Sequence, residues 1–302
     1  MSSDRPFRRR AIKLLARVLL GGRRAHYHSW WPSLRIEGRE AGRPGEVRFR
    51  GKDSLPLLGT DALAERAGER IVIVGSGPSV SGADLKGLPD RSTILLNGAI
   101  SLIGQGIDRP LAIAIEDERF VWRHFGMMRE RMTAPDTFCL MSPGVIRAIG
   151  ELDARFLEGR PLILIDDVSK PYGAPRRSAA DIAGFEFVTV AGDDGFSSDP
   201  DRGVFQGGSV AISALQFALA THAREIGFIG VDIANADGPR FYEVGGDIAF
   251  SGIAGAEKRI LGHIALAARI AAGNGVRLIN HSPVSALRSI GLDYRPLNQT
   301  AS

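Results

Sequence analysis

The chain has 302 residues, of which 44% are hydrophobic and 24% are charged. This length fits one large α/β domain or two small ones, and the composition is ordinary for a soluble globular protein. The single cysteine, Cys139, excludes an internal disulfide and favours a reducing compartment. The net charge of +4 comes from residues 1–24, because the remaining chain carries 30 basic and 33 acidic residues. We therefore expect no nucleic-acid partner, since nucleic-acid-binding folds usually carry the positive charge in their body.

Residues 1–24 predict a basic amphipathic helix. Arginines separate apolar residues at helical spacing, which are Phe7, Ala11, Leu14, Leu15 and Val18. Such a helix can lie on an anionic membrane surface, and residues 5–24 are the candidate segment. Packing on its own domain and a frayed terminus are the alternatives. The apolar runs are too short for a spanning helix or a secretory signal. We expect a cytoplasmic protein, peripheral on the inner face of the cytoplasmic membrane if the helix binds lipid.

Residues 25–69 are rich in Gly, Pro, Arg and aromatic residues, and they predict a connector with one hairpin. From residue 70 to 302, apolar strands alternate with amphipathic helices. The predicted strands are 71–75, 93–97, 111–115, 137–141, 162–166, 186–190, 226–231 and 276–280, and the predicted helices are 117–131, 143–149, 209–222 and 256–273. This alternation predicts an α/β fold: a Rossmann-like, mostly parallel sheet with helices on both faces. Residues 167–208 predict a long functional loop.

A glycine-rich turn directly follows the first predicted strand. It consists of Gly75, Ser76, Gly77, Pro78 and Ser79. Backbone N–H groups at such a turn favour an anion, usually a phosphate. The third glycine of a dinucleotide motif is replaced by Val80, proline lacks an N–H, and no acid follows to hold a ribose. These departures disfavour NAD or a flavin, and a tight structural turn without a ligand is the alternative.

A second turn, Gly207-Gly208-Ser209, opens a predicted helix, and the strand after that helix ends at Asp232. Asn97 ends the second predicted strand of the domain, where its carboxamide suits a pyrimidine or a ribose phosphate, although Asn-Gly pairs also form plain turns. Glu116 ends the third, and the following Asp117 suits a helix N-cap. Because the carboxyl ends of parallel strands share one edge, these residues predict one nucleotide-bearing substrate.

The motifs at 74–79, 96–97, 206–209, 229–232 and 280–287 resemble the bacterial sialyltransferases that use CMP-sialic acid, and related envelope glycosyltransferases, some of which use CMP-Kdo. The resemblance covers residues 70–290. It implies a single Rossmann-type domain, a CMP-activated donor, and neither metal nor cofactor. It places Ser76 near the donor phosphate and Asn97 on the donor. The same resemblance assigns the cytidine to Gly207, Gly208 and Ser209, the edge of the nucleotide to Asp232 and Ile233, and the leaving group to Tyr242.

The chain departs from this family at the catalytic base. The family's histidine before the last long helix has no counterpart in residues 250–258, and the first of its two tyrosines is missing. His281, Glu257 and Glu116 are the candidates for the base, whereas His263, inside a predicted helix, indicates packing. The resemblance implies transfer of sialic acid, Kdo or a similar ulosonic acid to a glycan or glycolipid acceptor of the envelope, as in lipopolysaccharide biosynthesis.

Two other functions stay open. Asp199-Pro200-Asp201 is similar to the Asp-x-Asp of metal-dependent transferases, although a solvated turn is the simpler interpretation. An Mg-ATP-dependent pyrophosphokinase would use these two carboxylates. A membrane-recruited binding module that has lost its base would keep the fold without catalysis. His26, His28, His124 and His222 lack the spacing of a zinc site.

Overall fold

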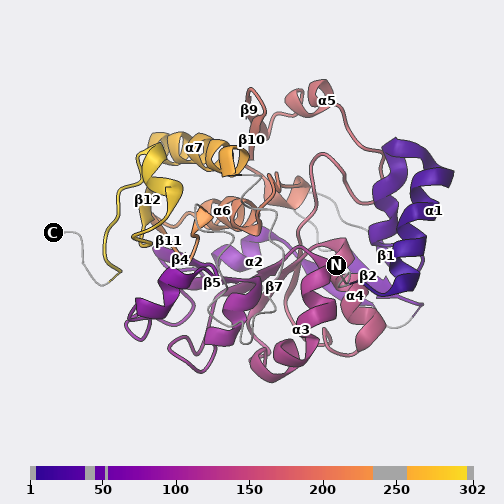
Figure 1. The fold of residues 1–302 in the computed structure, drawn as a ribbon, viewed down its shortest axis with the longest axis horizontal. Coiled ribbons are helices and arrows are strands. Elements are labelled where there is room, and N and C mark those ends of the chain that lie inside the picture. The colour runs from indigo at the N-terminus through magenta and orange to yellow at the C-terminus, as the bar shows by residue number, and fades with distance from the viewer. Residues whose placement is uncertain (1–4, 38–44, 52–53, 234–256, 298–302) are drawn as a thin grey trace.

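The computed structural model describes residues 5–37, 45–51, 54–233 and 257–297 (Figure 1). Within these residues, ten strands form one sheet in the order β1-β2-β3-β8-β7-β6-β5-β4-β11-β12. Every neighbouring pair from β3 to β12 is parallel, whereas β1–β2 and β2–β3 are antiparallel. The strands are β1 (Leu34–Glu37), β2 (Gly45–Phe49), β3 (Leu55–Leu58), β4 (Arg70–Val74), β5 (Thr93–Leu96), β6 (Ala112–Ile115), β7 (Phe138–Met141), β8 (Leu162–Leu164), β11 (Glu225–Ile229) and β12 (Arg277–Asn280).

Helices cover both faces of this sheet (Figure 1). Alternate residues of β4 divide between two apolar cores, because successive side chains of a strand point to opposite faces. Ile71 and Ile73 belong to the core that includes α6 and α7, and Val72 and Val74 to the core that includes α3 and α4. The predicted Rossmann-like fold is therefore confirmed. The helices are α1 (Phe7–Arg24), α2 (Thr60–Ala64), α3 (Glu118–Arg131), α4 (Pro143–Leu152), α5 (Ala179–Ala183), α6 (Val210–Ala220) and α7 (Glu257–Gly273).

One predicted strand lies outside the main sheet. The segment predicted as 186–190 forms β9 (Val188–Ala191), which pairs with β10 (Asp194–Ser197) in a separate antiparallel hairpin. Gly192, with φ 62°, makes the tight turn that folds β10 back on β9. Because the turn supplies a local partner, β9 does not need an edge of the main sheet, and most of its residues are exposed.

The segment 25–69 contains the predicted hairpin, β1–β2, but it also extends the main sheet. Its third strand, β3, pairs in parallel with β8, with Leu57 opposite Leu162. Leu34, Val47 and Leu57 bury their side chains in the same core as β5 and β7. The segment therefore belongs to the main sheet, which differs from the separate connector that its composition predicts.

The order of the strands places a crevice beside β4. The chain runs from β4 through β5, β6 and β7 to β8 on one side of β4, and then crosses to β11 and β12 on the other. In open α/β sheets, ligands bind outside the carboxyl ends of the strands at such a switch point. None of the helices in the described ranges is long and apolar enough to cross a bilayer.

Candidate active site

A cavity of about 1150 Å³ opens at the carboxyl ends of the neighbouring strands β8, β7, β6, β5, β4 and β11. The chain from Phe205 to Ala211, at the start of α6, forms one side, and Arg259 and His263 of α7 lie beside it. The helix α1 and the following 3₁₀ helix η1 (Ala25–Ser29) form another part of the wall. Pockets for small ligands commonly measure about 300–1,000 Å³, so this cavity is large enough for such a ligand.

Most of the predicted site residues border this one cavity. The residues that line it are Gly75, Ser76, Asn97, Glu116, Gly207, Gly208, Ser209, Asp232 and Ile233. Gly77, Pro78, Ser79, Glu257 and His281 are not among the lining residues that the structure describes. Tyr242 lies outside the described residues, so its predicted role stays a prediction.

The first glycine turn is joined to the end of β11. The N–H of Gly75 donates to the carbonyl of Ile229 at 2.7 Å, and the N–H of Gly77 donates to the carbonyl of Gly230 at 2.8 Å. The carboxylate of Asp232 accepts from the N–H of Ser79 at 2.8 Å and from its hydroxyl at 2.6 Å. The N–H groups of Gly75, Gly77 and Ser79, which the sequence predicts to bind a phosphate, therefore already donate to other parts of the protein. Residues 77–79 therefore fit the structural alternative, and Ser76 is the part of the turn that faces the cavity with Gly75.

The second glycine turn has the geometry of an anion site. Gly207 and Gly208 adopt positive φ angles of 54° and 96°, which glycine tolerates without strain. Ser209 caps α6 with its hydroxyl, and the N-terminus of α6 opens into the cavity. The Nε of Arg259 donates to the carbonyl of Gly207 at 2.8 Å, which holds the guanidinium beside the turn. A helix N-terminus and an arginine together favour a phosphate.

Two buried oxygens at the ends of adjacent strands have no hydrogen-bond partner among the described residues. They are Oδ1 of Asn97, after β5, and Oε1 of Glu116, after β6. Asn97 adopts φ 46°, a conformation that is uncommon for a residue other than glycine. A buried polar atom without a partner costs about 1–3 kcal/mol. Both residues line the cavity, so each of these oxygens is placed to accept a hydrogen bond from a molecule in it.

Glu116 is also electrostatically unusual. Burial raises its pKa to about 8, the nearby Ser213 hydroxyl opposes this shift, and the charges of Asp167 and Asp117 add to it. The carboxyl therefore carries a proton on average at neutral pH and loses it slightly above. An acid with such a pKa is suited to proton transfer near physiological pH.

Neither His281 nor His263 is placed as a free general base in the cavity. His281 is buried outside the cavity, with Nδ1 2.7 Å from the carbonyl of Arg295 and Nε2 3.4 Å from Nη2 of Arg70. Burial lowers its pKa. Its ring packs against Gly227 in the middle of β11, so the structure does not bring this candidate to the nucleotide edge. His263 borders the cavity, and its Nδ1 contacts the backbone N and O of Gly195 at 3.0 and 2.8 Å, which holds α7 against β10.

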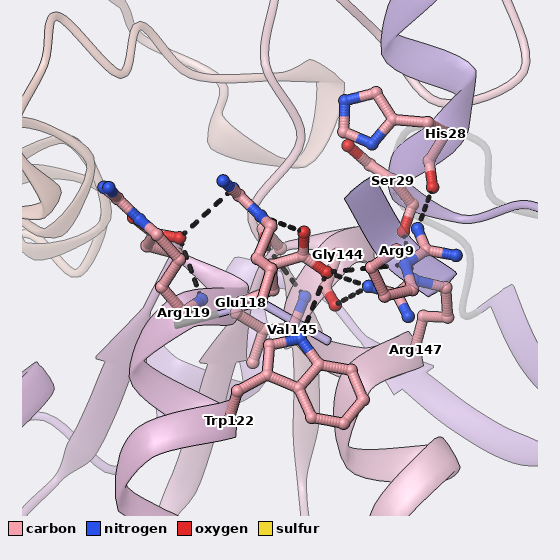
Figure 2. Close-up of polar contacts among 12 residues, drawn as sticks. Arg9, His28, Ser29, Glu118, Arg119, Trp122, Gly144, Val145 and Arg147 are labelled. Carbon is pink, nitrogen blue, oxygen red and sulfur yellow. Dashed lines mark hydrogen bonds and ion pairs between the residues drawn. The ribbon is translucent and has the colours of Figure 1, made fainter. Parts of the chain in front are cut away.

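The N-terminal helix docks through a buried cluster of charges (Figure 2). Arg9, which is 1% exposed, donates to the carbonyls of Trp31 and His28. Its guanidinium lies 3.9 Å from Glu118, which Arg147 also contacts. Burial alone would raise the pKa of Glu118, but the charges of Arg147, Arg5 and Arg9 outweigh burial and lower it. Glu118 and Arg147 lie more than 100 residues after Arg9, so no local pattern in the sequence predicts this cluster.

Only part of α1 is covered. Arg9, Ile12 and Ala16 are buried, which confirms that this face of the helix packs on its own domain. The apolar face predicted from the sequence points outward instead. Its exposed side chains, with their exposed fractions, are Phe7 (81%), Leu14 (65%), Leu15 (52%) and Val18 (71%).

Both carboxylates of the Asp-x-Asp pair accept hydrogen bonds from the protein itself. Asp201 accepts from the N–H and hydroxyl of Thr60, both at 2.9 Å, and Asp199 caps a short 3₁₀ helix, η4 (Pro200–Arg202). Neither residue lines the cavity. Across the described ranges, no group of three or more His, Cys, Asp or Glu side chains is placed to hold a metal ion.

Comparison with solved structures finds sialyltransferases, the class that the sequence motifs resemble. The monofunctional α-2,3-sialyltransferase Cst-I from Campylobacter jejuni is 12% identical, with a TM-score of 0.42 over 78% of this chain and 83% of that one. The sialyltransferase CstII, in complex with a trisaccharide acceptor and CMP, is 14% identical, with a TM-score of 0.40 over 77% and 89%. CstII from Campylobacter jejuni with the substrate analogue CMP-3FNeuAc is 15% identical, with a TM-score of 0.39 over the same shares. No family model and no curated protein matches the chain.

Proposed function

We propose that this protein is a glycosyltransferase that uses a CMP-activated sugar. One observation carries the proposal. The glycine turn at the start of α6, where the helix dipole is positive, faces the same cavity as two buried oxygens without a hydrogen-bond partner among the described residues, Oδ1 of Asn97 and Oε1 of Glu116. The turn at Gly207 and Gly208, with Arg259, suits the phosphate of the nucleotide. Oδ1 of Asn97 suits a donor such as a ribose hydroxyl or the cytosine amino group. Glu116 is then left for the acceptor hydroxyl.

The chemistry follows from these positions. The bond between the anomeric carbon and the phosphate oxygen breaks, and CMP departs with the electron pair. The N-terminus of α6 and Arg259 stabilise the charge that grows on the phosphate. The acceptor hydroxyl attacks the anomeric carbon and transfers its proton to the ionised carboxylate of Glu116. A pKa of about 8 leaves a fraction of Glu116 ionised at neutral pH while keeping it a strong enough base.

The donor sugar in this proposal is sialic acid, Kdo or a similar ulosonic acid, as the motif resemblance implies, and the acceptor is an envelope glycolipid. The outward face of α1 supports a lipid-borne acceptor. Phe7, Leu14 and Val18 are exposed together, beside exposed cations such as Arg8 and Arg10. An exposed apolar face with flanking arginines favours the interface of an anionic bilayer. The protein would then work as a peripheral protein on the cytoplasmic face of the membrane.

A nucleotide panel tests the donor. We expect CMP to raise the melting temperature of the protein, while UDP, NAD and Mg-ATP leave it unchanged. A ligand at 100 times its Kd adds about 2.7 kcal/mol of stability, which such a scan detects readily. Asn97→Ala and Arg259→Ala should weaken the response, and Arg269→Ala, elsewhere on α7 and outside the cavity lining, should not. Indifference to CMP would remove the proposal.

A second measurement separates an enzyme from an inactive binding module. Glu116→Gln keeps the shape of the side chain but cannot accept the proton. In the proposed mechanism this variant binds CMP normally and loses transfer or hydrolysis of the CMP-sugar. An unchanged turnover would assign the base to another residue.

A further inference from the structure

Two cations of α1 face the cavity and not the charge cluster that anchors the helix. Lys13 and Arg17 lie one turn apart, and both line the cavity while remaining exposed. Neither forms an ion pair with any residue in the described ranges, in contrast to Arg9 on the docked face. Two neighbouring like charges without partners cost free energy, and an anionic ligand would relieve this cost.

A third cation joins them from the loop after β8. Arg176 also lines the cavity and is exposed, without an ion pair to any described residue. Its backbone N–H donates to the carbonyl of Arg23 at 2.8 Å, which ties this loop to the end of α1. His26 strengthens the same junction, with Nε2 at 3.2 Å from the carbonyl of Ala174. Arg176 therefore lines the same cavity as Lys13 and Arg17, and its loop is bonded to the chain just after the break in the helix at Gly21.

The helical period places Lys13 and Arg17 at the border between two surfaces. With about 100° per residue, Arg9, Ile12 and Ala16 share the docked face, and Leu14 and Val18 lie roughly opposite. Lys13 and Arg17 fall between these faces, on the side of the cavity. If the apolar face enters a bilayer, these two cations stand at the level of the lipid phosphates.

We propose that Lys13, Arg17 and Arg176 form a subsite for the phosphate of a membrane-anchored, phosphate-linked saccharide, which is the acceptor. This inference rests on the proposed function and names the acceptor class. The lipid tails would lie along the apolar face of α1, the phosphate would bind the three cations, and the sugar would reach into the cavity. In the proposed function the donor phosphate binds at Arg259 and the start of α6, which line the same cavity, as does Glu116 for the proton transfer.

The test uses two matched double variants of the full chain. Lys13→Gln with Arg17→Gln removes two cations that line the cavity, and Arg8→Gln with Arg24→Gln removes two exposed cations of α1 that do not. The probe is dihexanoyl phosphatidylinositol below its micelle concentration, titrated by calorimetry. We expect the cavity pair to bind it about 30-fold more weakly than wild type, from about tenfold per 1.4 kcal/mol and about 1 kcal/mol per cation. The control pair should bind it like the wild type.

Vesicles and CMP complete the design. Co-sedimentation with phosphatidylcholine vesicles that contain phosphatidylglycerol should fall equally in the two pairs, because both lose the same charge. Equal loss of the soluble lipid in the two pairs, or no binding by wild type, would overturn the subsite. Binding of free inositol 1-phosphate as tightly as the lipid would overturn the lipid-anchored acceptor. CMP binding is measured in parallel: if CMP fails to bind while the cavity pair alone loses the lipid, the subsite stands and the proposed donor is wrong.

Discussion

Replacing Glu116 by glutamine should change how the stability of the protein depends on pH. Between the ordinary pKa of 4.5 and the folded-state pKa of about 8, the native carboxyl keeps a proton that the unfolded chain has lost. The wild-type free energy of unfolding therefore falls as pH rises through this window, by about 1.4 kcal/mol per pH unit. Glu116→Gln has no proton to lose, so its stability relative to wild type should grow across the same window.

The size of the effect follows from the shift. A pKa displaced from 4.5 to about 8 corresponds to at most about 5 kcal/mol above pH 8, and water in the cavity reduces this value. The assay is urea unfolding of both proteins at pH values from 4 to 9, about one pH unit apart, which resolves the change in the free energy of unfolding with pH. The difference between the two proteins cancels other titrating groups. Glu65→Gln, at an exposed glutamate, is the control and should give a flat difference. A flat difference for Glu116→Gln would refute the burial of the carboxyl.

Three further predictions concern the framework around the cavity. Arg9→Met leaves Glu118 without one of its buried partners, so the free energy of unfolding measured in urea should fall by about 3–5 kcal/mol, and α1 should be cleaved earlier by a protease. Arg10→Met, at an exposed position, should change this free energy by less than about 0.5 kcal/mol. Asp232→Ala removes the acceptor of both Ser79 bonds and should cost about 3 kcal/mol and weaken CMP binding. Asp84→Ala, at an exposed residue shortly after the same turn, should do neither. Burial raises the pKa of the Cys139 thiol to about 12, so a thiol reagent at neutral pH should react at the rate of unfolding, and rapid labelling of native protein would contradict its burial.

The central strands were predictable from the sequence because buried parallel strands are continuous apolar runs. Ile71 to Val74 form such a run, bounded by a glycine turn. Once the sheet is predicted, the rule that parallel strands share a carboxyl edge brings Asn97, Glu116 and Gly207 to one place. The structure confirms that these residues line one cavity.

The remaining features depend on contacts between distant segments. The sequence predicts a phosphate at the amides of the first glycine turn, because nothing local shows that Asp232 lies beside Ser79. The direction of the His281 ring depends on Gly227 and Arg295, which periodicity does not place. An arginine in an amphipathic helix normally predicts an exposed position, so the burial of Arg9 follows only from the acids that approach it in the fold.

The pairing of β3 with β8 has a consequence for synthesis of the protein. Leu57 has no strand partner until Leu162 is synthesised, and Arg9 has no carboxylate partner until Glu118 is synthesised, a similar interval. At about 5–20 residues per second, the first part of the nascent chain remains without its final partners for roughly 5–20 seconds. The buried arginine that anchors this part of the cavity wall therefore lacks its carboxylate partner until Glu118 has been synthesised.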